Sequence, residues 1–212
     1  MKPNPARRIS DPTTEDTLTY QIGDKLYINL TDRCTLSCQF CPKHNQSTEV
    51  KGHELFLSQR PDVSEIIDLI GDPQDFSEIV FCGYGEPTLR LKPLLQIAQY
   101  VKARNGKVRL NTDGLANRFH KRDVIPELAS CIDSLSISLN AQNEEIYQQH
   151  CKPALSESYN AVLMFIEQAV PHFDEVAVSA IDGLAGVDID ACRELVEQRG
   201  ATFKRRILDQ VG

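Results

Sequence analysis

The sequence predicts an α/β fold, an open and partial (βα)6 TIM-like barrel, from three observations. Six short runs rich in β-formers alternate with runs of helical periodicity, which is the pattern of parallel strands joined by helical crossovers. Six strands are too few to close the usual eight-stranded barrel, so the sheet should stay open. Along several strands apolar and polar side chains alternate, which indicates one face packed under helices and one polar face.

The expected elements follow one another as strand and helix along the chain. The β-like runs cover residues 26–31, 78–83, 107–112, 133–140, 175–181 and 202–208. Apolar residues recur at i, i+3, i+4 and i+7 in helical runs that begin at Val63, Leu94 and Val162, and a last helix covers 189–196. Residues that stop helices follow these runs at Gly71, Gly106, Pro171 and Gly200.

The polar face of the expected sheet should line the inside of the barrel. In the run 133–140, apolar residues alternate with serines and Asn140. Helices must cover the apolar face, so we expect the polar face to form a ligand chamber rather than a packed core. Arg109 should point into this chamber, and so should one of Arg205 and Arg206. The alternative is an antiparallel sheet with one solvated face.

Length and composition are those of one ordinary globular domain. The chain has 212 residues, 41% hydrophobic and 25% charged, and its net charge of −7 argues against general nucleic-acid binding. No apolar run approaches the roughly 18 residues of a membrane span, so we expect no membrane partner. Residues 1–19 are polar and lack the apolar stretch of a secretory signal. We expect a loose tail over 1–19 and the folded domain over 20–212.

Three of the seven cysteines stand close together, just past the first expected strand. Cys34, Cys38 and Cys41 form a C-x3-C-x2-C motif, and with no export signal the pattern favours a metal site in a reducing cytoplasm over disulfides. Three thiolates can hold three irons of a [4Fe–4S] cluster, which leaves the fourth iron without a protein ligand. A structural zinc site with His44 or His53 as the fourth ligand is the alternative, and it would make the chain a non-catalytic module.

A second motif, Phe81-Cys-Gly-Tyr-Gly-Glu-Pro-Thr88, ends the second expected strand. Its two glycines would let the backbone approach a ligand closely. Glu86 would project a carboxylate at the rim, and Pro87 would end the strand. The carboxyl ends of strands in α/β sheets are where ligand sites gather, so this motif and the cysteine motif should lie together.

Together these residues resemble the radical SAM (S-adenosylmethionine) superfamily. Its marks are the C-x3-C-x2-C motif, the aromatic Phe40 before the last cysteine, and the Gly83-Tyr84-Gly85-Glu86-Pro87 turn. The family fold is a full or partial (βα)6 barrel, which matches the expected strand count. Three longer strings resemble the small radical SAM proteins associated with TatD-type hydrolases: Cys-Gly-Tyr-Gly-Glu-Pro-Thr-Leu-Arg, Arg-Leu-Asn-Thr-Asp-Gly and Ser-Ile-Ser-Leu-Asn-Ala.

The resemblance implies a role for each matching position. The three cysteines would ligate the cluster, and the amino and carboxylate groups of SAM would chelate the open iron. Gly83, Tyr84, Gly85 and Glu86 would bind the SAM amino group, through the Glu86 side chain or backbone carbonyls. The other positions implied for SAM are Phe40, near the adenine, and Asn111, Thr112, Ser138 and Asn140, near the ribose and the methionyl carboxylate.

The resemblance also implies a reaction and partners. The reduced cluster would cleave SAM, and the resulting 5′-deoxyadenosyl radical would abstract hydrogen from a substrate that the sequence does not identify. A reductant such as flavodoxin or ferredoxin would supply the electron, and a TatD-like hydrolase would be a working partner. Cys151 is a candidate hydrogen donor or substrate-site residue, although an incidental thiol at a helix end explains it as well.

Two related enzymes remain as alternatives. A glycyl-radical-enzyme activase is similarly small, but activases often carry Asp and Lys where this chain has Ser138 and Asn140. The small radical SAM synthase of the deazaguanine pathway is the other.

Overall fold

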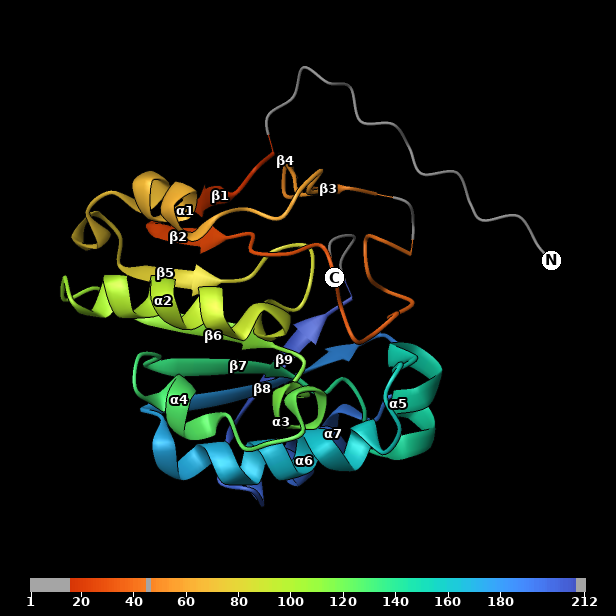
Figure 1. Cartoon of the computed structure of the whole chain (residues 1–212). Helices are drawn as coiled ribbons and strands as arrows, with labels where there is room; N and C mark the ends of the chain where they lie inside the picture. The colour runs from red at the N-terminus through yellow and green to blue at the C-terminus, as the bar shows by residue number, and fades with distance from the viewer. Residues whose placement is uncertain (1–15, 45–46, 209–212) are drawn as a thin grey trace.

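The computed structural model describes residues 16–44 and 47–208. Its main sheet has seven strands in the order β1-β2-β5-β6-β7-β8-β9 (Figure 1). The strands from β2 to β9 are parallel, and β1 runs antiparallel to β2. Their bounds are β1 Thr19–Ile22, β2 Lys25–Ile28, β5 Glu78–Phe81, β6 Val108–Thr112, β7 Ser134–Ser138, β8 Glu175–Asp182 and β9 Thr202–Ile207. The six predicted strands are confirmed, and within the described residues β1 and β9 form the edges of an open sheet.

Seven helices connect the strands in the described part of the chain and lie along the outer side of the curved sheet (Figure 1). They are α1 Val63–Ile70, α2 Leu91–Lys102, α3 Ala116–His120, α4 Ile125–Ala129, α5 Glu144–Cys151, α6 Ser158–Ala169 and α7 Ile189–Glu197. Short 3-10 turns stand at η1 Pro73–Asp75, η2 Pro87–Arg90 and η3 Val170–His172, and a small hairpin pairs β3 Glu49–Val50 with β4 His53–Glu54. The helices predicted from apolar periodicity, α1, α2, α6 and α7, are confirmed.

The two faces of the sheet differ as the alternation predicts. In β7 the apolar residues Leu135 and Ile137 are buried, while the serines between them are only half-buried. In β6 Val108 and Leu110 are buried, and Arg109 and Asn111 stand on the other face. The apolar faces of the strands and the inner sides of the helices form one continuous core. The polar face is therefore the one that helices leave uncovered.

The residues just before β2 are bound to the domain. Thr19 pairs with Ile28 in the β1–β2 ladder, and the Asn29 side chain donates to the Thr17 carbonyl over 3.0 Å. The Asp16 carboxylate accepts bonds from the Ser58 backbone and hydroxyl. Residues 16–19 of the expected tail are thus hydrogen-bonded rather than loose, and residues 1–15 lie outside the described residues. Among the described residues, no helix has both the length and the apolar character needed to cross a membrane.

Candidate active site

The cysteine motif lies in the loop that leaves the carboxyl end of β2. Cys34 is exposed, Cys38 and Cys41 are half-buried, and all three are free thiols. A parallel sheet gathers the ends of its strands at one edge, so this loop stands beside the turns that follow β5 and β6. The structure therefore brings the cysteine motif and the Gly83–Pro87 turn together, as the sequence predicts.

Helix α5 holds the cysteine loop at its carboxyl end. The Ser37 N–H donates to the Cys151 carbonyl over 3.0 Å, and the Gln39 N–H donates to the His150 carbonyl over 2.9 Å. The last carbonyls of a helix lack partners within the helix, so the loop satisfies groups that would otherwise need water. A further bond, from the Ala154 N–H to the Thr35 carbonyl over 2.9 Å, fixes the start of the loop.

The donor set of this loop fits a [4Fe–4S] cluster, in which each iron takes one thiolate. In the described residues, no three or more His, Cys, Asp or Glu side chains are arranged to hold a single metal ion. A cluster does not need ligands that converge on one point, because it distributes them over several irons.

The two glycines of the Gly83–Pro87 turn are required by the neighbouring chain. A Cβ on Gly83 would lie 2.6 Å from the Asn29 Cα, and one on Gly85 would lie 2.6 Å from the Thr31 carbonyl oxygen. Two bonds pin the turn to the same segment: Tyr84 N–H to Asn29 Oδ1, 3.0 Å, and Glu86 N–H to the Arg33 carbonyl, 2.7 Å. We expected the glycines to let a ligand approach the backbone. The structure gives another reason for them, because the segment that leads into the cysteine loop packs against the turn. No donor in the described residues reaches the carbonyls of Gly83, Tyr84 or Gly85.

The Glu86 side chain does not project at the rim, contrary to the sequence interpretation. Glu86 is only 4% exposed, and its Oε1 accepts bonds from the Thr88 N–H at 3.0 Å and the Thr112 hydroxyl at 2.9 Å. Its Oε2 accepts the Asp113 N–H at 2.7 Å. Glu86 also caps the N-terminus of η2. A carboxylate followed by proline and threonine is a good helix cap, and this local role draws the side chain inward.

A second buried carboxyl, Asp113, lies beside Glu86. Its Oδ1 accepts the Leu115 N–H at 2.9 Å, and its Oδ2 accepts the Thr35 hydroxyl. Burial and the Asp113 carboxyl raise the pKa of Glu86 to about 8, and burial raises the pKa of Asp113. Thr35 directly follows Cys34, so this pair joins the cysteine loop, the Gly83–Pro87 turn and the turn after β6. We name Glu86 and Asp113 the carboxyl pair.

The strand-end residues that the resemblance implies for SAM do not all lie on the same face of the sheet. Asn111 and Ser138 stand on the polar face, at the ends of β6 and β7. Thr112 points to the opposite, buried face, where its hydroxyl is bonded to Glu86. Asn140 is buried with a φ of 61°, and its Oδ1 has no partner among the described residues. A buried acceptor without a partner is rare in proteins and is suited to a ligand donor.

Two further predicted residues lie near the cysteine loop. Phe40 is half-buried and packs against the hydrophobic core. Cys151 is buried at the end of α5, and its carbonyl oxygen lies 3.8 Å from the Cys38 Sγ. Sequence reasoning missed Tyr147, which is fully buried on α5 and whose hydroxyl has no partner in the part of the chain that the structure describes. Helix α5 has only eight residues, most of them polar, so no helical repeat of apolar residues indicates that Tyr147 is buried.

The arginines expected to face the chamber are mostly paired. Arg109 binds the Glu78 carboxylate at 2.9 Å and donates to Asn111 Oδ1 at 3.0 Å. Lys25 binds the same carboxylate at 2.9 Å, so an ion-pair network stands at the start of the polar face. Arg109 therefore has structural partners of its own.

Of the two arginines in β9, Arg206 is the one on the polar face. Arg205 pairs with Asp182, whereas Arg206 is in register with Ile181. Burial raises the pKa of the Cys82 thiol, and Arg206 is one of the groups that oppose this rise, so the two side chains are near each other.

Comparison with known proteins identifies the family and the fold. Residues 28–198 match the family model described as the radical SAM superfamily. A dual-specificity RNA methyltransferase RlmN of Buchnera aphidicola is 30% identical over 122 residues, 53% of this chain and 32% of that protein. A probable RlmN of Exiguobacterium sibiricum is 27% identical over 127 residues, 56% of this chain and 34% of that protein. The chain thus spans about a third of the length of these curated relatives.

Solved structures show the same fold. Streptococcus suis SuiB bound to its precursor peptide SuiA has a TM-score of 0.66 at 14% identity, over 88% of this chain and 40% of that chain. TYW1 with a lysine–pyruvate adduct has a TM-score of 0.60 at 13% identity, over 86% of this chain and 64% of that chain. The finer resemblance to TatD-associated proteins stays a prediction. The chain belongs to the radical SAM superfamily, whose enzymes use a [4Fe–4S] cluster and S-adenosylmethionine.

Proposed function

We propose that this protein cleaves SAM reductively and uses the product to abstract hydrogen from a substrate held against the polar face of the sheet. The single observation that carries the proposal is the carboxyl pair. Its hydrogen bonds to Thr35 and Thr112 tie the cysteine loop to the turns after β5 and β6. Such a tie fixes a cluster-binding loop relative to a SAM-binding turn, and catalysis depends on that fixed geometry.

In this proposal Cys34, Cys38 and Cys41 hold the cluster. The bound cluster and SAM supply one-electron cleavage of the sulfonium and, from it, hydrogen abstraction. The carbonyls of Gly83 to Gly85, which no described donor reaches, accept the N–H bonds of the SAM ammonium group. The buried Oδ1 of Asn140 accepts a further donor from SAM, and Phe40 packs near the adenine. The Glu86 carboxylate acts only through the turn that it supports.

Asn111 and Ser138 complete the proposed SAM site from the polar face, while Thr112 contributes through its bond to Glu86. Cys151 is kept as a residue next to the cluster loop, and we assign it no chemical step. In this proposal the domain covers residues 20–212, and residues 16–19 are hydrogen-bonded to its described part. The seven free cysteines support a reducing compartment, the cytoplasm. A flavodoxin or ferredoxin supplies the electron, and the string resemblance supports a TatD-like hydrolase as partner.

Anaerobic reconstitution tests the proposal. We expect about four irons per chain, as a [4Fe–4S] cluster requires, and formation of 5′-deoxyadenosine when dithionite and SAM are added. Cys34→Ala should lose both properties, whereas Cys131→Ala removes a buried thiol outside the cysteine loop and should keep them. Tight binding of zinc with no SAM cleavage would instead establish the non-catalytic module.

A further inference from the structure

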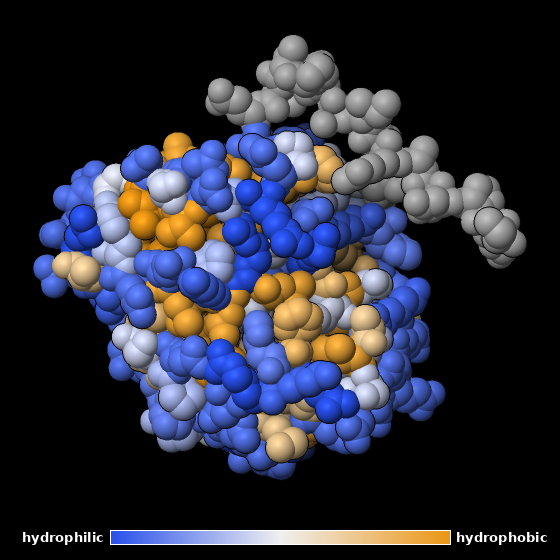
Figure 2. Space-filling model, viewed as in Figure 1, coloured by the Kyte–Doolittle hydropathy of each residue, from blue (hydrophilic) through white to orange (hydrophobic). Residues whose placement is uncertain are grey.

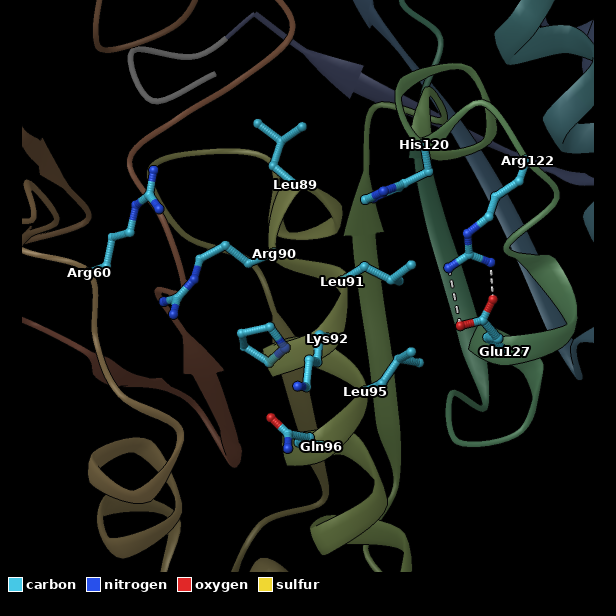
Figure 3. Close-up of a pocket in the computed structure, with 11 residues that line it drawn as sticks. Arg60, Leu89, Arg90, Leu91, Lys92, Leu95, Gln96, His120, Arg122 and Glu127 are labelled. Carbon is cyan, nitrogen blue, oxygen red and sulfur yellow. Dashed lines mark hydrogen bonds and ion pairs between the residues drawn. The ribbon is translucent and has the colours of Figure 1, made fainter.

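A surface groove lies outside the site described above, between the start of α2 and the helices α3 and α4 (Figure 3). It has a volume of about 610 Å³. Its charged and titratable lining consists of Arg60, Arg90, Lys92, His120, Arg122 and Glu127. We call it the basic groove. Neither the sequence motifs nor the proposed function account for it.

The charges of the basic groove are unbalanced. Its one carboxylate, Glu127, is bonded by Arg122 through both guanidinium nitrogens, as the dashed lines in Figure 3 show. Arg60 and Lys92 are exposed and form no ion pair within the described residues. The chain as a whole carries a net charge of −7, so a local surplus of cations is unusual on this surface.

Arg90 adds to the positive charge of the groove, because no carboxylate in the described part of the chain neutralises it. Its guanidinium donates to two backbone carbonyls, of Leu30 at 3.0 Å and of Pro61 at 2.8 Å, and to no carboxylate in the described residues. Desolvation lowers the pKa of Arg90, and the nearby Arg60 lowers it further. The nearby Asp62 acts in the opposite direction, but neither Arg60 nor Arg90 forms an ion pair in the described residues. An anionic surface that covers them would therefore stabilise both cations.

The basic groove shares an edge with the cysteine loop. Arg90 contacts Leu30, which stands four residues before Cys34. A fully extended chain spans at most about 3.6 Å per residue, so the Cα atoms of Leu30 and Cys34 are within about 14 Å of each other. His120 extends the link, since its Nε2 lies 2.8 Å from the Thr88 carbonyl, two residues after Glu86. The Arg90 end of the groove therefore lies next to the segment that leads into the cysteine loop.

Burial distinguishes an apolar floor from a charged rim in the groove: the leucines that line it are buried or half-buried, whereas Arg60, Lys92 and Arg122 are exposed. Leu89, Leu91 and Leu95 line it together with the cations (Figure 3). The face shown in Figure 2 likewise has apolar surface interrupted by hydrophilic residues. An apolar centre with a polar rim is typical of a protein–protein interface, whereas a site for a small anion would converge on a single point.

We propose that the basic groove docks the acidic surface of a one-electron carrier protein of the flavodoxin or ferredoxin class. This inference rests on the proposed function, because it supplies the entry point for the electron that SAM cleavage consumes. Opposite charges steer the encounter of the two proteins, and the apolar floor then contributes area to the docked complex.

A charge-reversal pair tests the docking site. Arg60→Glu together with Lys92→Glu changes two exposed groove cations of the wild-type protein, while Lys51→Glu together with Lys107→Glu changes two cations outside the groove that are exposed and form no ion pair in the described residues. With dithionite as reductant, we expect all three proteins to form 5′-deoxyadenosine at the same rate. With limiting reduced flavodoxin, the groove variant should show an apparent KM raised about tenfold or more and the control less than about twofold. The difference should shrink as salt increases.

Binding of oxidised flavodoxin to each cluster-loaded protein, measured by titration calorimetry, provides a readout that does not depend on catalysis. Weaker binding by the groove variant alone supports the docking site, and equal binding by all three proteins overturns it. If a single-stranded oligonucleotide binds the groove in place of flavodoxin, the proposal is also overturned. If dithionite yields no 5′-deoxyadenosine, the proposed function fails, while the binding measurement still decides where the carrier docks.

Discussion

Replacing Asp113 with asparagine should weaken the pH dependence of stability. The pKa of Glu86 is about 8 in the folded protein against an ordinary value of 4.5, because of burial and the Asp113 carboxyl. A carboxyl with a raised pKa binds more protons in the folded state than in the unfolded one. Its contribution is therefore complete below the unfolded value and is lost as the pH rises towards 8. Wild-type stability should fall across this window.

The size of the effect follows from the same values. A difference of about 3.5 pH units, at about 1.4 kcal/mol for each unit, sets an upper limit of about 5 kcal/mol on the loss. Asp113→Asn removes one titrating group and the second cause of the Glu86 shift, after burial, so this loss should become smaller. Asparagine keeps the Oδ1 acceptor for the Leu115 N–H, which limits the cost of the substitution itself.

The assay is urea unfolding of the cluster-free protein from about pH 5 to about pH 8. The Asp113→Asn variant should lose less stability than wild type over this range. An equal loss in the two proteins would refute the idea that the carboxyl pair shares a costly negative charge. A variant destabilised by more than about 3 kcal/mol at every pH would show that Asp113 acts only as a hydrogen-bond acceptor.

Three other substitutions probe the same edge of the sheet. Gly85→Ala would put a Cβ 2.6 Å from the Thr31 carbonyl oxygen, so we expect a loss of about 2 kcal/mol or more in urea unfolding and poor cluster loading; normal values for both would contradict the packing argument. Thr35→Val removes the bond to Asp113 and should cost about 1–2 kcal/mol, with iron per chain falling after reconstitution; unchanged iron would separate the carboxyl pair from the cluster loop. Tyr147→Phe removes a buried hydroxyl that has no partner in the described residues, so the cluster-free protein should be as stable as wild type or slightly more stable. A loss of more than about 1 kcal/mol in the free energy of unfolding would mean that the hydroxyl does form a hydrogen bond.

The regular part of the fold could be predicted because its signals are local. Strands β6 and β7 alternate in polarity residue by residue, and α1, α2, α6 and α7 carry apolar positions at helical spacing. Helix α5 gave no such signal, because its eight residues are mostly polar. Its buried residues are Tyr147, His150 and Cys151, and none of them lies among the first three residues of the helix. Strand β1 was missed for a similar reason: it has four residues and obtains its stability from pairing with β2.

The site was predicted as a set of residues, but not as an arrangement. Spacing alone indicates that three cysteines can bind a cluster, yet nothing in it shows that α5 holds their loop. The direction of the Glu86 side chain depends on donors that lie up to 27 residues away in the chain. Asp113 belongs to one of the strings that carry the resemblance, and only the structure reveals its bond to Thr35. Long-range hydrogen bonds of this kind leave no periodic trace in the sequence.

The central claim is that Cys34, Cys38 and Cys41 hold a cluster with one iron open to SAM. The most direct test is the electron paramagnetic resonance spectrum of the dithionite-reduced, reconstituted protein, recorded with and without SAM. We predict the signal of a reduced [4Fe–4S] cluster whose shape changes when SAM is added and stays unchanged when 5′-methylthioadenosine, which lacks the amino and carboxylate groups of SAM, replaces it at the same concentration. A cluster signal that SAM does not alter, or no cluster signal at all, would contradict the account.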